Sequence, residues 1–292
     1  MISIKRLNWT LAACAALVTF LATPVLAQDD DERELGWAFE AELGSLWTDG
    51  NQETFTLAFS GQLEYTWPVS RIRFKAGGFS TESSLTTTTA VGTGQTDFQL
   101  FEETVTEKTA ETFYSRARYD YDITENFFVV GGVDWLRNTF AGIDSRLLLA
   151  AGAGNRWADN DRVRFETDYA LTYTFEEEVV ANPFNESNFP GVRLAYDFKW
   201  NLTQTTIFES TLISDFNLDN TDDIRLDWHN ALPINISSVL AFKPSIRLLW
   251  RNDPALQEVP LLDAPGGDPV GAVFAPLNKL DSYFNLSLLF KF

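Results

Sequence analysis

The chain has 292 residues, of which 45% are hydrophobic and 22% are charged, and its formal net charge at pH 7 is −19. It contains one Cys and one His, which excludes a disulfide framework and metal sites that need several thiolates or imidazoles. A charge this negative argues against binding to a nucleic-acid backbone, and no motif predicts a cofactor or a metal.

Residues 1–27 have the pattern of a cleaved signal peptide. Two basic residues precede an apolar run over 7–21, and Val25 and Ala27 occupy the small-residue positions before a cleavage site. We therefore expect export of the chain, with a short polar tail over 28–34 at its mature start.

Two other interpretations of this segment stay open. One is an uncleaved membrane anchor, although the apolar run is short for a span and polar residues interrupt it. The other is a lipoprotein, because Leu11-Ala12-Ala13-Cys14 resembles a processing box that would make Cys14 a lipidated N-terminus. The apolar stretch continues past Cys14, which favours cleavage after Ala27.

Beyond this segment, apolar and polar residues alternate along most of the chain. Over 55–67 the odd positions read Phe, Leu, Phe, Gly, Leu, Tyr and Trp, whereas the even positions are small or polar. Strict alternation predicts a strand with one apolar and one polar face. The stretch is longer than a usual globular strand and matches a tilted membrane-spanning strand of roughly 9–11 residues.

The same alternation predicts twelve strands. Their apolar faces lie within 37–43, 55–67, 72–76, 113–121, 127–135, 147–157, 163–173, 192–200, 208–216, 224–232, 240–250 and 280–292.

The connections between these strands alternate in length. Most turns at one rim are short, whereas the other rim has long loops at about 80–111, 174–190 and 252–278. This arrangement and the even strand count predict an all-β, closed, antiparallel up-and-down transmembrane β-barrel over 35–292. An open sheet edge in lipid would leave amides unpaired, so the barrel has to close. A soluble sandwich that buries its aromatic residues is the alternative, which strand composition alone does not exclude.

Six tryptophans predict where the barrel meets the two membrane surfaces. Trp67, Trp157 and Trp200 end strands at the short-turn rim, and Trp47, Trp135 and Trp250 end strands at the long-loop rim. An indole at such a position buries its ring in lipid and still reaches water.

The polar faces of the predicted strands carry charged residues that we expect to face the lumen. They are Glu40, Glu42, Arg71, Arg73, Lys75, Arg116, Arg118, Arg162, Arg164, Glu166, Asp168, Arg193, Lys199, Lys243 and Arg247. These charges can pair and plug the barrel, or they can line a narrow pore and set its ion preference. The long loop 80–111 could fold inward as a constriction.

A membrane-embedded hydrolase is the alternative of a different class. His229 shares a predicted inner face with Asp227, and a His oriented by a carboxylate can act as a general base. The sequence contains no Gly-x-Ser-x-Gly motif, and no strand supplies an evident Ser partner. We therefore expect no enzyme.

Several stretches resemble a known family. They are Leu43-Gly44 with Thr48-Asp49-Gly50-Asn51-Gln52-Glu53-Thr54, Tyr119-Asp120-Tyr121-Asp122-Ile123-Thr124, Phe140-Ala141-Gly142-Ile143-Asp144-Ser145-Arg146 leading into Ala151-Gly152-Ala153-Gly154, and Leu286-Ser287-Leu288-Leu289-Phe290-Lys291-Phe292. Together they are similar to the salt-induced outer-membrane proteins, a bacterial barrel family with a domain of unknown function. The resemblance implies a Gram-negative outer membrane and a link to osmotic or salt stress, and it supplies no catalytic residues.

The expected function is thus a narrow pore for ions or small solutes, and the alternative is a plugged structural or surface-interaction barrel. The closing Phe290 and Phe292 are similar to the signal that the barrel-assembly machinery recognises. That machinery, the outer-membrane lipid and the surface glycolipid beside the acidic outer loops are the expected partners.

Overall fold

The computed structural model describes residues 35–292, with gaps at 49–51, 95–96, 183–185 and 263–267. The expected signal peptide and polar tail lie outside these residues and stay predictions. Within the described part of the chain, no helix is both long enough and apolar enough to cross a membrane.

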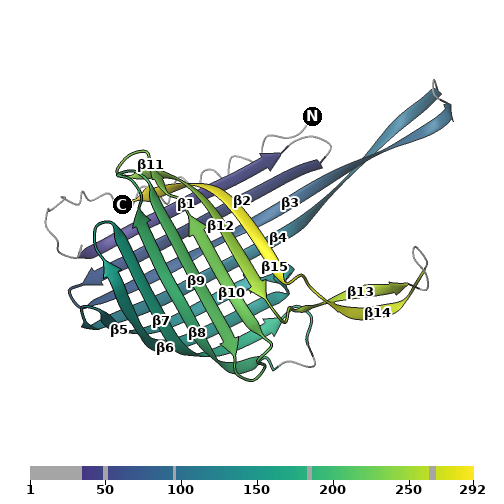
Figure 1. The fold of residues 1–292 in the computed structure, drawn as a ribbon. Coiled ribbons are helices and arrows are strands. Elements are labelled where there is room, and N and C mark those ends of the chain that lie inside the picture. Colours follow the sequence, from purple (N-terminus) through teal and green to yellow (C-terminus); the bar gives the residue numbers. More distant parts are fainter. Residues whose placement is uncertain (1–34, 49–51, 95–96, 183–185, 263–267) are drawn as a thin grey trace. The chain divides into compact units, whose positions relative to one another are not determined.

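Twelve strands form one closed antiparallel barrel (Figure 1). They are β1 (Gly36–Thr48), β2 (Gln52–Trp67), β3 (Ser70–Gly94), β4 (Asp97–Thr124), β5 (Phe127–Asn138), β6 (Ile143–Asp159), β7 (Val163–Glu178), β8 (Asn188–Asn201), β9 (Ile207–Asn217), β10 (Ile224–Ala231), β12 (Leu240–Arg251) and β15 (Leu280–Lys291). Each strand coincides with one of the strands that the alternation predicts, so the prediction of a twelve-stranded barrel is confirmed.

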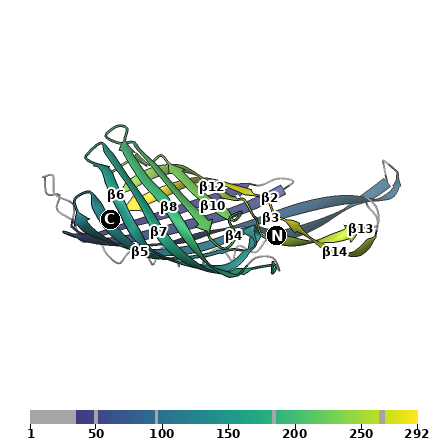
Figure 2. The same cartoon turned by 60° about the horizontal axis from the view of Figure 1, so that its bottom comes forward.

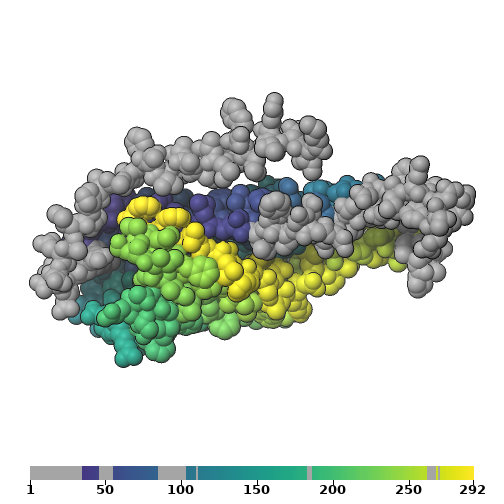
Figure 3. Space-filling model, turned by 90° about the horizontal axis from the view of Figure 1, so that it is seen from above, coloured from purple at the N-terminus to yellow at the C-terminus, as the bar shows by residue number. Residues whose placement is uncertain are grey.

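The barrel closes between its first and last strands. β1 pairs with β15, β15 pairs with β12, and β12 pairs with β10. In the view from above, the yellow end of the chain lies beside the purple β1 (Figure 3). A closed sheet with a polar inner face excludes the sandwich alternative.

The outer face of the barrel is apolar. Side chains such as Phe59, Leu171 and Phe284 are 46%, 71% and 72% exposed, although their neighbours along the strands are half-buried or buried. Soluble proteins rarely expose so much contiguous apolar surface. Because this surface surrounds a closed barrel, the fold is that of a transmembrane β-barrel.

The long-loop rim contains more strand than the sequence predicts. The segment 80–111 is expected to be a loop, but β3 and β4 continue through it and extend beyond the wall as a two-stranded ribbon (Figures 1 and 2). Its Thr-rich sequence suits a pleated strand. The ribbon projects away from the barrel, so the suggestion that this segment folds into the lumen is wrong.

The other long connections also contain secondary structure. β7 extends to Glu178, and the connection after β12 contains a separate hairpin of β13 (Leu256–Leu262) and β14 (Pro269–Pro276). At the opposite rim, the two-residue strand β11 (Ile234–Asn235) pairs with β12 in the turn that follows β10.

One glycine joins three of the outer connections. Gly142 has φ +76° and caps the 3₁₀ turn η2 (Thr139–Ala141). A Cβ at this position would overlap the side chain of Ala255, which is fully buried. The Gly142 carbonyl also accepts a hydrogen bond from Val179 N–H at 2.9 Å. The connections after β5, β7 and β12 therefore meet at this residue.

The described Trp side chains near the rims differ in exposure. Trp67, Trp157 and Trp200 are exposed close to the ends of β2, β6 and β8. Trp135 is half-buried, and its indole N–H donates to Ser145 Oγ at 3.2 Å. Trp250 is half-buried, and the side chain of Trp47 lies outside the described residues. That these residues mark the membrane surfaces stays a prediction.

Candidate functional site

The inner face of the barrel carries ion pairs between strands that are not neighbours. Arg71 on β3 lies 3.6 Å from Glu166 on β7, although β4, β5 and β6 separate these strands. With a spacing of about 4.8 Å between neighbouring strands, β3 and β7 are roughly 19 Å apart along the wall. The two side chains can meet only across the lumen.

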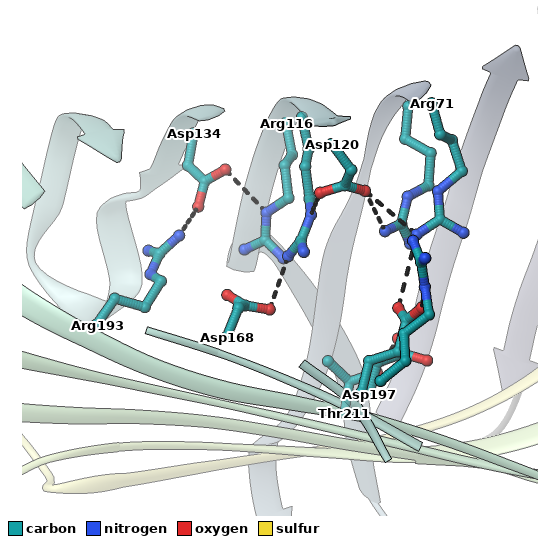
Figure 4. Close-up of polar contacts among 12 residues, drawn as sticks. Arg71, Arg116, Asp120, Asp134, Asp168, Arg193, Asp197 and Thr211 are labelled. Carbon is teal, nitrogen blue, oxygen red and sulfur yellow. Dashed lines mark hydrogen bonds and ion pairs between the residues drawn. The ribbon is translucent and has the colours of Figure 1, made fainter. Parts of the chain in front are cut away.

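The first group of charges lies near the short-turn rim, and we call it the turn-side network. It comprises Arg71, Arg73, Arg118, Asp120, Arg156, Arg164, Glu166 and Asp168. Asp120 at its centre is fully buried and accepts hydrogen bonds from Arg71 and Arg73 at 3.2 Å each and from Arg118 at 2.7 Å. One carboxylate therefore holds three guanidinium groups together (Figure 4).

An aromatic ring supports this network from the inner wall. Phe128 on β5 is fully buried, and its ring lies 5.8 Å from the Arg118 guanidinium and 5.1 Å from that of Arg156. The ring fits because the residue that faces it is Gly154. A Cβ atom at position 154 would overlap the ring. The absence of a side chain at position 154 is therefore what lets the ring pack against the inner wall.

The second group crosses the middle of the barrel, and we call it the middle layer. It comprises Arg116, Asp134, Arg193, Asp215, Asp227 and Arg247. Asp134 on β5 accepts from Arg116 at 2.9 Å and from Arg193 on β8 at 2.6 Å (Figure 4). Asp227 and Arg247, on the neighbouring strands β10 and β12, form a two-point pair at 2.7 and 2.8 Å.

The third group lies toward the long-loop rim, and we call it the loop-side network. It comprises Glu176, Glu178, Asp223, Arg225 and Arg251. Arg225 and Arg251 both bind Glu176 and Asp223, so each of these two carboxylates is shared by two guanidinium groups.

Asp223 lies in the connection just before β10 and is buried. Burial alone would raise the pKa of its carboxyl group. The hydrogen bonds and charge of Arg225, together with the charge of Arg251, outweigh burial and hold the pKa of Asp223 below its usual value.

The structure places several of the charges predicted to face the lumen in ion pairs of the inner face. Those in the turn-side network and the middle layer are described above; Lys243 pairs with Glu42 at 2.5 Å, and Glu40 lies half-buried two residues from Glu42. Lys199 is exposed near the turn-side end of β8. The prediction for Arg162 is wrong, because β7 begins only at Val163 and Arg162 lies exposed in the preceding turn.

Two cavities occupy the lumen along its length. The central cavity has a volume of about 250 Å³ and reaches from Arg118 and Glu166 of the turn-side network to the middle layer. The loop-side cavity has a volume of about 120 Å³ and reaches from the middle layer to the outer connections at Pro254 and Asn278. Both cavities share walls formed by Arg116, Asp134, Arg193, Asp227 and Arg247. The middle layer is therefore the partition between them.

Lys75 and His229 line the central cavity. His229 does not form the catalytic arrangement considered from the sequence, because both carboxylate oxygens of Asp227 bind Arg247. The residue opposite His229 on β9 is Thr211, whose hydroxyl donates to Asp197 at 3.3 Å (Figure 4). The described residues thus present no Ser–His–Asp arrangement here, and they contain no group of three or more His, Cys, Asp or Glu placed to hold a metal ion.

Several lumen residues that the structure shows to be central are not among those expected from the sequence. They are Phe128, Asp134, Arg146, Arg156, Glu176, Asp215, Asp223, Arg225 and Arg251. The alternation that places Leu147 and Leu149 outward also places Arg146 and Arg156 inward, so this signal was available. Glu176 falls in the connection expected over 174–190, whereas β7 continues to Glu178.

Several solved barrels are similar to the chain at low sequence identity. The NanC porin is 10% identical with a TM-score of 0.46, covering 87% of this chain and 100% of that one. The KdgM porin is 7% identical with a TM-score of 0.40, covering 87% and 99%. A FadL homologue of Pseudomonas aeruginosa is 12% identical with a TM-score of 0.35, covering 89% and 76%.

No curated protein matches the chain. The sequence profile of a family described as "Protein of unknown function, DUF481" matches residues 41–260, which is most of the chain. The protein therefore belongs to the DUF481 family.

Proposed function

We propose that this protein is an integral outer-membrane barrel that conducts ions or small solutes through a narrow lumen, which the middle layer obstructs in the present conformation. The observation that carries the proposal is the pair of stacked cavities with one shared wall. The partition between the cavities consists of side chains, and side chains can rotate to open a passage. In narrow pores, rings of charged side chains set the preference for one ion over another.

The proposed location follows from the surface of the barrel. Lipid stabilises its apolar outer face, which water would not. The closed wall separates the ion pairs of its inner face from that lipid. Insertion by the barrel-assembly machinery, with Phe290 and Phe292 as its signal, and contact of the outer loops with surface glycolipid belong to the same proposal. The link to osmotic or salt stress rests only on the resemblance to the salt-induced family.

A plugged barrel without transport is the second candidate, and the turn-side network favours it. The side chains of Arg71, Asp120 and Glu166 are at most 4% exposed and meet from strands on different sides of the lumen. Such contacts could fill that end of the barrel permanently.

One experiment in planar lipid bilayers separates the two candidates. The purified full chain is expected to give stepwise conductance, and the double variant Asp227→Ala/Arg247→Ala is expected to give larger steps. This variant removes an opposite-charge pair from the middle layer and leaves the net charge unchanged.

The matched control is Arg137→Ala/Asp144→Ala, which removes an exposed ion pair outside both cavities. It is expected to conduct like the unaltered protein. If neither the unaltered protein nor the middle-layer variant conducts at any voltage, the pore is excluded and the plugged barrel is favoured.

A further inference from the structure

Arg146 is the one arginine of the loop-side cavity that forms no hydrogen bond or close ion pair with the described residues, and the carboxylates of Glu176 and Asp215 act on its charge only from a greater distance. It lies on β6 directly opposite Glu176 of β7, which is the carboxylate expected to pair with it. Glu176 instead accepts from Arg225 on β10, three strands further along the wall, and from Arg251 at 3.1 Å. Among the described residues, no hydrogen bond or ion pair is formed by the Arg146 guanidinium, which is on the cavity wall.

The charge of the cavity wall is predominantly positive. Seven of its lining residues are basic and four are acidic. Glu176 and Asp223, which balance Arg225 and Arg251, are both buried and do not line this cavity. Arg225 and Arg251 are thus neutralised from behind the wall, whereas Lys279 adds a positive charge where the outer connections meet the wall.

The remaining wall is partly apolar. Leu148, Ile213 and Ala255 contribute to it beside the polar Asn138 and Asn278, so a bound ion would lose part of its water. A charge interacts more strongly with its partner where water is excluded. The guanidinium fork matches the geometry of carboxylate and phosphate oxygens, and the volume of about 120 Å³ admits a small anion together with water.

We propose that the loop-side cavity binds a small carboxylate or phosphate anion, with Arg146 as its main ligand. This inference rests on the proposed function in one respect, because it takes the anion to be a solute that passes through the lumen. It adds the chemical class of that solute. Binding itself requires the cavity and not conduction.

The test is calorimetric titration of the full chain in detergent micelles with sodium acetate and, separately, with sodium phosphate. At least one of the two anions is expected to bind saturably with one site per chain, and the tighter of the two identifies the ligand class. Arg146→Met is expected to weaken this binding at least tenfold, whereas Arg146→Lys is expected to retain part of it because the charge remains.

The matched control is Arg137→Met, which removes an equal charge at the same rim from a residue that is exposed and does not line the cavity. It should bind like the unaltered protein. If Arg146→Met does not fold, as judged by circular dichroism, Arg146→Gln replaces it. The proposal is overturned if neither anion binds saturably to the unaltered protein, or if removing the Arg146 charge leaves the affinity unchanged.

The outcome for this site is separate from the outcome for the pore. Binding in micelles without conductance in bilayers would support the anion site and contradict the conduction proposal. Conductance without saturable binding would do the reverse.

Discussion

At the scale of single residues, the lumen depends on a few carboxylates that each neutralise several arginines. Asp120 is the clearest case, because three guanidinium groups converge on a fully buried side chain. Removing one partner of a buried ion pair leaves charge uncompensated, which is far more costly than the net value of the pair.

We therefore predict that Asp120→Asn lowers the free energy of unfolding by about 3–5 kcal/mol. Asp144→Asn, which breaks the exposed pair with Arg137, should change it by about 0–1 kcal/mol. Urea unfolding in lipid vesicles, followed by tryptophan fluorescence, measures both. Equal effects of the two substitutions would show that water in the lumen screens Asp120 as it screens the surface.

A second prediction at this scale concerns pH. Asp223 has a lowered pKa in the folded protein, so its ionised carboxylate stabilises the fold above the unfolded pKa of about 3.9. That contribution falls as the pH drops below this value and passes through the folded pKa. Arg225 and Arg251 keep their charge throughout this range.

Asp223→Asn is therefore expected to destabilise the protein most at neutral pH, and progressively less below about pH 4. The free energy of unfolding of the variant and of the unaltered protein is compared across this range. A difference that does not change with pH would mean that the carboxylate acts through its shape and hydrogen bonds rather than its charge.

At the scale of elements, the strands of the wall can be predicted from the sequence because lipid imposes a simple rule. Every second residue of a strand meets acyl chains, so the alternation is strict wherever the strand crosses the membrane. The rule fails beyond the membrane. In β3 and β4 the ribbon over 80–111 is rich in Thr and shows no sustained alternation, and the same composition suits a loop.

The candidate site is less predictable than the strands. Alternation shows that Arg71 and Glu166 point inward, but not that they meet across the lumen. That contact depends on the strand stagger and on the curvature of the whole wall, which no single strand encodes. The error at Arg162 has a simpler origin, since a shift of one residue in the start of β7 moves it from the wall into a turn.

The ribbon itself leads to a prediction about modularity. β2 pairs with β3 only up to Leu85, and β5 pairs with β4 only from Thr112, so the distal parts of β3 and β4 pair only with each other. Deleting 87–103 and joining Thr86 to Thr104, which are cross-strand partners, through Asn-Gly should preserve a hairpin.

We expect the shortened chain to unfold at the same temperature as the unaltered protein and to have the same single-channel conductance. Thermal unfolding by circular dichroism and bilayer recording check the two expectations. A marked increase in conductance would instead indicate that the ribbon obstructs the lumen in the membrane.

At the scale of the whole molecule, closure depends on a short seam. The ladder between β1 and β15 comprises only the four pairs from Glu40–Lys291 to Leu43–Leu288, whereas β1 pairs with β2 along its full length. An unpaired edge in lipid would cost several kcal/mol for each unsatisfied group. The seam must therefore hold in the membrane if the barrel is to be stable there.

A cross-link tests the register of the seam. Leu43 and Leu288 are direct partners on the outer face, and the separation of such partners suits a disulfide. The variant Leu43→Cys/Leu288→Cys, made in a Cys14→Ser background, should therefore oxidise to an intramolecular disulfide. The control Leu43→Cys/Phe284→Cys moves the second thiol four positions along the same face of β15, roughly 13 Å away, and should stay reduced. Non-reducing electrophoresis and mass spectrometry of membrane-inserted protein distinguish the two. Efficient cross-linking of the control, or none in the paired variant, would show that β1 and β15 meet in another register, and the positions of Glu42 and Lys243 in the lumen would then have to change with it.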